Sequence, residues 1–219
     1  MQAVAIDRKG VRRPGRFILR LVVLSLLTVA YFFAGKFGLS LAFVNPSATA
    51  VWPPTGIALA ACLIMGDYAG IGILLGAFLV NFTTSGLVLS SIAVAIGNTL
   101  EGLIGARLVR RFAQGTEAFN RAPDVFKFAL LAGLLSTAVS ATVGVTSLIW
   151  SGLASPNEYL TVWLTWWLGD AGGSLIVAPA LILWATNPKI RWHIGRAAEV
   201  IFLLASLLLV ALADRKSVV

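Results

Sequence analysis

Asp170 is a lone acidic residue within the sequence WWLGDAGGSLIVAP, and no other charged residue occurs between Tyr159 and Thr186. An ionisable group at bilayer depth costs at least about 2.5–3.5 kcal/mol on insertion scales, so protein, water, a proton or a ligand must offset it. On a helix, the residues that share its face are Trp166, Trp167, Gly173 and Ser174. Such a face can bind a cationic or hydrogen-bonding ligand, or hold a structural acid tied to Asn or Ser of neighbouring spans.

Asn98 and Glu101 are three residues apart and therefore lie on one helix face. Glu101 falls about a turn and a half from the end of its apolar run. It can snorkel to that end, or pair with Arg107, Arg110 or a basic residue of another helix, and a structural ion pair or hydrogen bond is the simplest account. Asn81 stands towards the end of another apolar run, where it can join a polar cluster or face the surface.

The residue types needed for metal binding or nucleophilic catalysis are missing from the sequence. Its single histidine, His193, stands in a basic segment, so there is no cluster of imidazole ligands. A Ser-His-acid set, a Gly-x-Ser-x-Gly elbow and a glycine-rich phosphate loop are all absent. The single cysteine, Cys62, lies in an apolar run and cannot form an internal disulfide. We therefore expect no metal, no cofactor and no enzymatic activity.

The composition is that of an integral membrane protein. Hydrophobic residues make up 58% of the 219 residues and charged residues 12%, with a mean hydropathy of +0.91. Soluble domains carry about 25% charged residues, and a helical span needs about 20 mainly apolar ones. We predict seven spans, at residues 17–36, 47–66, 68–85, 86–106, 126–150, 159–185 and 197–213. The expected fold class is all-α, a polytopic transmembrane helical bundle.

Basic residues cluster before the first span and in two loops, at 107–125 and 186–196. Even numbers of spans separate these segments, so all of them can lie in the cytoplasm, as the positive-inside rule requires. This topology accounts for the net charge of +8 without nucleic acid as a partner. It predicts a multi-pass membrane protein with a cytoplasmic N-terminus.

Three regions follow from this topology: a basic cytoplasmic segment at 1–16, a membrane domain at 17–213 and a short tail at 214–219. Seven spans leave the tail outside the cytoplasm, although it carries Arg215 and Lys216. An eighth span missing from the chain would resolve this conflict and would make the tail a truncation point. The alternatives are an interfacial final run and an exception to the rule.

Proline and glycine positions predict how the helices begin and pack. The Pro53-Pro54 pair is expected in the first turn of the second helix, where proline loses no needed hydrogen bond. Gly-x-x-x-Gly pairs at Gly72 and Gly76, and at Gly169 and Gly173, predict close contact between helices. No repeat of 20–50 residues is apparent, so an internally duplicated transporter receives no support.

The ordered motifs resemble those of a bacterial family, the membrane-associated sensor domain of the first type. The matching segments are WPPTGIALA from Trp52, GAFLVN from Gly76, NTLE from Asn98 and WWLGDA from Trp166, followed by Pro179. The resemblance covers residues 15–213. It implies an all-helical input module of the inner membrane with an eighth span. Such a module normally precedes a cytoplasmic histidine kinase, diguanylate cyclase or cyclic-di-GMP phosphodiesterase, and the resemblance implies no particular ligand.

The candidate ligand-binding or switch residues are Asp170, Glu101, Asn98, Asn81, Trp166, Trp167 and Trp52. Our leading hypothesis is a sensor in which a stimulus alters contacts around Asp170 and Glu101 and moves the terminal span. Such a switch requires unequal ligand affinity for two states of the bundle. The expected partners are the lipid bilayer, a cytoplasmic effector, an unidentified small ligand and a second copy in a homodimer.

Two other classes of function fit the same residues. The first is a small transporter or substrate-binding membrane subunit that holds its substrate with the intramembrane acids. The second is a standalone assembly subunit that works through lateral helix contacts. A substrate accumulated in vesicles would favour the former, and a stable membrane protein partner the latter.

Overall fold

The computed structural model describes residues 14–42 and 44–186. Within them the chain is helical, with no strand beyond one isolated bridge between Asn45 and Ala48. The α-helices are α1 (Pro14–Ser40), α2 (Pro53–Met65), α3 (Ala69–Ser85), α4 (Val88–Phe112), α5 (Ala122–Phe128), α6 (Thr137–Trp150), α7 (Tyr159–Gly172) and α8 (Ala178–Thr186). The predicted all-α class is confirmed for this part of the chain.

Shorter helical segments complete the longer helices. A π-helical segment, Ala129–Leu135, joins α5 to α6, and a second one, Gly173–Val177, joins α7 to α8. Single 3₁₀ segments occur at Gly115–Asn120 and at Pro156–Glu158. The latter begins with a capping box at Ser155, which satisfies backbone N–H groups at the start of the helix.

Four helical stretches are long and apolar enough to cross a membrane: Phe17–Ser40, Val88–Phe112, Ala122–Trp150 and Pro156–Thr186. The helices α2 and α3 are apolar but shorter, with 13 and 17 residues. The prediction of seven spans is therefore more than the structure shows. The predictions that lie outside the described residues concern the N-terminal segment up to residue 13, the basic loop from residue 187 with His193, the seventh run at 197–213 and the tail at 214–219.

The second predicted span, at 47–66, is helical only from Pro53 to Met65. The Pro53-Pro54 pair begins α2 as predicted. A residue that precedes proline disfavours the α conformation, and Trp52 accordingly adopts φ −127° and ψ 77°. At 1.5 Å per residue, α2 is about 20 Å long, less than the roughly 30 Å of a bilayer's hydrocarbon core. The predicted span thus includes six residues, 47–52, that precede the helix.

The non-helical segment at 44–52 leads into α2 and is held by several hydrogen bonds. Asn45 is central to it, since its carbonyl oxygen accepts from the Ala48 N–H at 2.9 Å and its Oδ1 from the Ser47 N–H at 2.9 Å. Its Nδ2 donates to the carbonyl oxygen of Leu153, after α6, at 3.2 Å. Irregular backbone at membrane depth requires such partners within the protein.

The glycine pairs allow the close contacts that were predicted for them. A Cβ on Gly169 would collide with the carbonyl oxygen of Thr49, and one on Gly173 with that of Trp52. The segment 44–52 therefore packs directly on the backbone of α7 and its π-helical extension. In the other pair, a Cβ on Gly76 would lie 2.9 Å from the Cβ of Tyr31 on α1.

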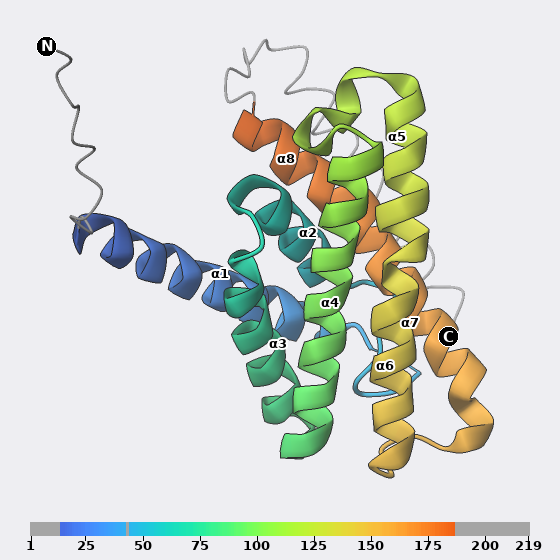
Figure 1. Cartoon of the computed structure of the whole chain (residues 1–219). Coiled ribbons are helices and arrows are strands. Elements are labelled where there is room, and N and C mark those ends of the chain that lie inside the picture. The colour runs from blue at the N-terminus through green and yellow to red at the C-terminus, as the bar shows by residue number, and fades with distance from the viewer. Residues whose placement is uncertain (1–13, 43, 187–219) are drawn as a thin grey trace, which may run out of the picture. The chain divides into compact units, whose positions relative to one another are not determined.

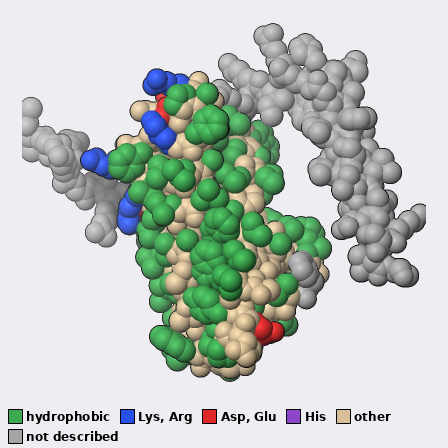
Figure 2. Space-filling model, turned by 90° about the vertical axis from the view of Figure 1, so that its right-hand side faces the viewer, with side chains coloured by type: hydrophobic (Ala, Val, Ile, Leu, Met, Phe, Trp, Pro, Cys, Tyr) green, Lys and Arg blue, Asp and Glu red, His purple; other side chains and the backbone are tan. Residues whose placement is uncertain are grey.

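The helix α1 crosses the other helices at a steep angle, whereas α3, α4 and α6 run alongside one another (Figure 1). Much of α1 is exposed, and Phe17, Phe33 and Phe37 each expose more than half of their surface. Figure 2 shows hydrophobic side chains over most of the face that it displays. Such an apolar exterior suits contact with lipid.

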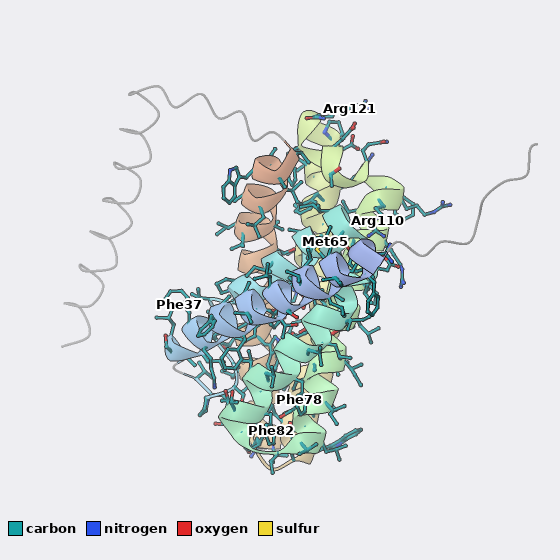
Figure 3. The ribbon with its side chains drawn as sticks, turned by 90° about the vertical axis from the view of Figure 1, so that its left-hand side faces the viewer. Phe37, Met65, Phe78, Phe82, Arg110 and Arg121 are labelled. Carbon is teal, nitrogen blue, oxygen red and sulfur yellow. The ribbon has the colours of Figure 1, made fainter. Side chains whose placement is uncertain are left out.

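Basic side chains gather at one end of the described helices, which we call the basic end (Figure 2). It is formed by the side chains of Arg107, Arg110, Arg111, Arg121 and Lys127. In Figure 3, Arg110 and Arg121 lie towards this end, and Phe78 and Phe82 towards the opposite one.

Candidate functional site

Asp170 lies on α7, near the middle of the stretch Pro156–Thr186, and is fully buried, with 0% of its surface exposed. Its Oδ1 accepts a hydrogen bond from Thr55 Oγ1 at 2.7 Å. Its Oδ2 has no hydrogen-bond partner among the described residues. Because Thr55 belongs to the first turn of α2, Asp170 stands at the positive end of that helix's dipole, which stabilises negative charge.

Glu101 and Asn98 reach the same place from α4. Glu101 is 2% exposed and lies near the carboxyl group of Asp170 and the hydroxyl groups of Thr55 and Ser140. Its Oε1 has no hydrogen-bond partner within the part of the chain that the structure describes. Asn98 Oδ1 accepts from Ser140 Oγ at 2.8 Å, which leaves its buried Nδ2 without a partner there.

Of the alternatives that the sequence leaves open for Glu101, pairing with Arg107 or Arg110 does not occur. Both arginines bind Asp67, between α2 and α3, with Nη–Oδ distances of 2.7 and 2.9 Å. Arg110 Nη2 also donates to the carbonyl oxygen of Cys62, near the end of α2. The two arginines lie about 9 and about 14 Å further along α4 than Glu101, so their flexible side chains extend to the exposed acid rather than the buried one.

The two adjacent tryptophans of α7 have different surroundings. Trp166 is buried, and its Nε1 donates to Ser140 Oγ at 3.2 Å. Trp167 is half-buried, donates to the carbonyl oxygen of Leu134 at 3.0 Å and stacks on Trp163. Successive residues on a helix point about 100° apart, so only Trp166 of this pair belongs to the site around Asp170.

Ser174 does not contribute to the face around Asp170 either. Its Oγ donates to the carbonyl oxygen of Ala132 at 2.8 Å, which links the two π-helical segments. The wider turn of a π-helix changes the direction in which later side chains point. The regular helical spacing that placed Ser174 beside Asp170 therefore does not hold beyond Gly172.

Trp52 and Asn81 lie where the segment 44–52 meets the site. Trp52 is buried, and its Nε1 is close to the hydroxyl group of Tyr31. Asn81 is buried as well, but its Nδ2 donates to the Ala77 carbonyl oxygen of its own helix at 2.8 Å. Trp52, Asn81 and Trp166 line a small pocket of about 10 Å³. The other lining residues are Ser47, Ala48 and Thr49.

Tyr31, Thr55 and Ser140 belong to the site but were not predicted. Tyr31 of α1 is 0% exposed, and its hydroxyl group has no hydrogen-bond partner among residues 14–42 and 44–186. Serine and threonine in helices commonly bond to their own backbone, so a sequence rarely singles one out. The only available signals were the position of Thr55 after two prolines and a lone tyrosine in the first apolar run.

These residues form one buried cluster, which we call the polar core. It comprises Tyr31, Trp52, Thr55, Asn98, Glu101, Ser140, Trp166 and Asp170. The buried side-chain atoms without a hydrogen-bond partner in the described chain are Tyr31 Oη, Trp52 Nε1, Asn98 Nδ2, Glu101 Oε1 and Asp170 Oδ2. All five belong to the polar core. Because buried polar groups are nearly always paired, the core has unused capacity to donate and to accept hydrogen bonds.

An apolar exterior, long helices and a buried polar core together define a polytopic integral membrane protein. The family model of MASE1 matches residues 21–214, so the chain belongs to the MASE1 family of membrane sensory domains. This result confirms the resemblance of the ordered motifs. No curated protein and no solved structure matches the chain.

Proposed function

We propose that this domain is the input module of a signalling protein, and that its polar core receives the stimulus. The observation that carries the proposal is the set of five buried polar atoms without a partner among the described residues, which come from α1, the residue before α2, α4 and α7. A ligand bound there contacts four parts of the bundle at once. The output passes to a cytoplasmic effector, a histidine kinase or an enzyme of cyclic-di-GMP metabolism, as in the family that the motifs resemble.

The relay starts at Asp170 and runs along the helix that carries it. Asp170 is followed within three residues by the π-helical segment Gly173–Val177 and then by α8. π-helical turns inside α-helices are frequent at functional sites. A ligand that binds one arrangement of this segment more tightly than another shifts the population towards it. The shift moves α8 and, beyond it, the predicted span at 197–213.

The orientation that we propose places the basic end in the cytoplasm and the protein in the bacterial inner membrane. The positive-inside rule supports this arrangement. In it, α2 and α3 complete two crossings with the help of the segment 44–52, and the predicted run at 197–213 makes a further one.

Asp170→Asn and Glu101→Gln test this function in the protein that carries the effector. Each variant is expected to lower the change in effector output between stimulating and non-stimulating media at least about fivefold, the lower range of allosteric coupling. The readout is autophosphorylation or cellular cyclic-di-GMP, with the amount of inserted protein measured in parallel. The exposed Glu117→Gln serves as the control. A normal response in both core variants would remove the polar core from the mechanism.

A small transporter or substrate-binding subunit is the second candidate, and the start of α2 within the bundle favours it. Discontinuous helices whose N-termini point at bound groups are typical of transporter sites near the membrane midplane. Here the group at that terminus is the chain's own Asp170. Accumulation of a substrate in vesicles would support this reading, and an effector encoded in frame after Val219 would argue against it.

A further inference from the structure

We propose that the polar core binds one small monovalent cation, of the size of Na⁺ or ammonium, between the carboxyl groups of Asp170 and Glu101. The proposal deepens the sensory function by naming the chemical class of its ligand. It rests on that function only in treating the polar core as the receptor site.

Charge balance is the first argument for a cation. The ion pairs of the described residues join Asp67 to Arg107 and Arg110, and Asp124 to Lys127. None of them involves the two carboxyl groups of the polar core. Burying charges without a partner costs several kcal/mol per ion. A bound cation between the two carboxyl groups offsets that cost for both.

The surroundings of the two acids reduce the negative charge that a cation has to balance. Asp170 already receives the Thr55 hydroxyl group and stands at the N-terminus of α2, whose dipole is equivalent to roughly half a positive charge. Glu101 lies well inside α4, away from both helix ends. One acid is therefore partly compensated and the other is not. The dipole leaves roughly one and a half negative charges on the two carboxyl groups when both are ionised, so a monovalent cation balances most of this charge and a divalent cation exceeds it.

The atoms around the two carboxyl groups suit such a ligand. Asp170 Oδ2, Glu101 Oε1 and Tyr31 Oη are buried oxygen atoms without a partner in the described chain. Thr55 Oγ1 donates its hydrogen to Asp170 and keeps its lone pairs for a cation. Oxygen ligands of this kind suit hard cations. The aromatic side chains of Tyr31, Trp52 and Trp166 belong to the same core, and aromatic rings attract cations, including ammonium groups.

Available space limits the ligand's size. The pocket beside Trp52, Asn81 and Trp166 has a volume of about 10 Å³, which is close to the smallest space that holds one water molecule. Two of its walls, Trp52 and Trp166, are also members of the polar core. Neither acid lines this pocket, but as the space found beside the polar core it suits a group about as small as water and is too small for a quaternary ammonium compound such as choline.

Cation titration of the purified chain tests the proposal without any effector. The full 219-residue chain in detergent is kept in choline chloride, which is then replaced by NaCl or NH₄Cl at constant ionic strength and pH. We expect a saturable rise in the melting temperature and saturable binding of radioactive ²²Na⁺ in dialysis. Asp170→Asn and Glu101→Gln should each weaken the apparent affinity at least about tenfold, because each removes one charge from the pair.

Two further variants keep the test decisive. Tyr31→Phe removes one oxygen ligand while retaining the ring, so it should weaken binding even where an acid variant fails to fold. Glu117→Gln removes an exposed acid and should bind like the wild type. Equal responses to choline and Na⁺, the absence of a saturable response, or unchanged binding in both acid variants would each overturn the proposal. If the cation binds but does not change the output of the effector, the proposed relay is wrong and the cation site still stands.

Discussion

Three acidic residues of this domain, Asp67, Glu101 and Asp170, show two contrasting environments. Asp67 is exposed and lies between two arginine side chains at the basic end. Asp170 and Glu101 are buried well inside the long helical stretches Pro156–Thr186 and Val88–Phe112, with hydroxyl and amide neighbours but no cation among the described residues. The first arrangement ties helices together, whereas the second leaves buried hydrogen-bonding capacity unused among the described residues.

The Asp67 cluster predicts a specific pH dependence of stability. Arg110 and Arg107 donate hydrogen bonds to this carboxyl group and hold the pKa of Asp67 below its usual value. A lowered pKa stabilises the fold above the unfolded-state pKa, and the stabilisation is lost as the pH falls through the folded-state pKa. We therefore expect Asp67→Asn to lower the melting temperature slightly at pH 7. The difference from the wild type should disappear as the pH falls below about 3.9.

Melting curves of both proteins in detergent between pH 7 and pH 3 measure this difference. The effect should be small because the side chains are largely exposed, and 1 M salt should reduce it further. A difference that stays constant across this pH range would show that the ion pairs do not stabilise the fold.

At the scale of elements, α2 is the helix that departs most from a simple span. Its first turn was predictable, since Pro53-Pro54 can begin a helix but cannot continue one. The preceding residues were assigned to the same span because hydropathy measures apolar character and not backbone hydrogen bonding. Only the contacts of Asn45 and the backbone approach at Gly169 make an irregular segment stable at this depth.

Two glycines of α7, three residues apart, should respond to alanine in opposite ways. A Cβ at Gly169 collides with the Thr49 backbone, so Gly169→Ala should reduce the free energy of unfolding by about 1–3 kcal/mol, the usual cost of overpacking. A Cβ at Gly172 meets no atom within 4 Å. Gly172→Ala should therefore be neutral or stabilise by up to about 1 kcal/mol, because alanine favours the helix.

Unfolding curves of both variants in the same detergent give the comparison. Equal destabilisation by the two substitutions would indicate that helix propensity, rather than contact with the segment 44–52, determines the outcome.

At the scale of the whole domain, most basic side chains of the described helices lie at one end. Arg107 and Arg110 close the turn between α2 and α3, and the Arg20 guanidinium lies 5.5 Å from the centre of the Tyr68 ring. Apolar residues from α1 to α8 cover the sides. This distribution is what a bilayer imposes on a helical protein, and it makes the orientation testable.

Reporter fusions should reveal the proposed orientation. A reporter that is active only in the cytoplasm should work when inserted at Gly115–Asn120, beside the basic end. A reporter that is active only in the periplasm should work between α6 and α7, at residues 151–157. Seven spans also predict periplasmic activity for a fusion after Val219, whereas an inverted pattern at the two internal sites would refute the positive-inside assignment.

The sequence by itself determined the membrane class, the helical fold, the start of α2 and the membership of a sensory family. These follow from composition, from local chemistry such as Pro53-Pro54, and from the order of short motifs. It also singled out Asp170, Glu101 and Asn98, because a polar residue in an apolar run is conspicuous. All of these properties can be inferred along the chain without knowing which helices pack together.

Only the tertiary structure decided which polar groups meet. It showed that Tyr31, Thr55 and Ser140, from three separate helices, belong to the site and that Trp167 does not. It also showed that Arg107 and Arg110 of α4 pair with Asp67. The physical reason is that a hydrogen-bond partner depends on which helix faces pack together. In this domain, packing is determined by glycine contacts and an irregular segment that hydropathy and helical periodicity do not describe.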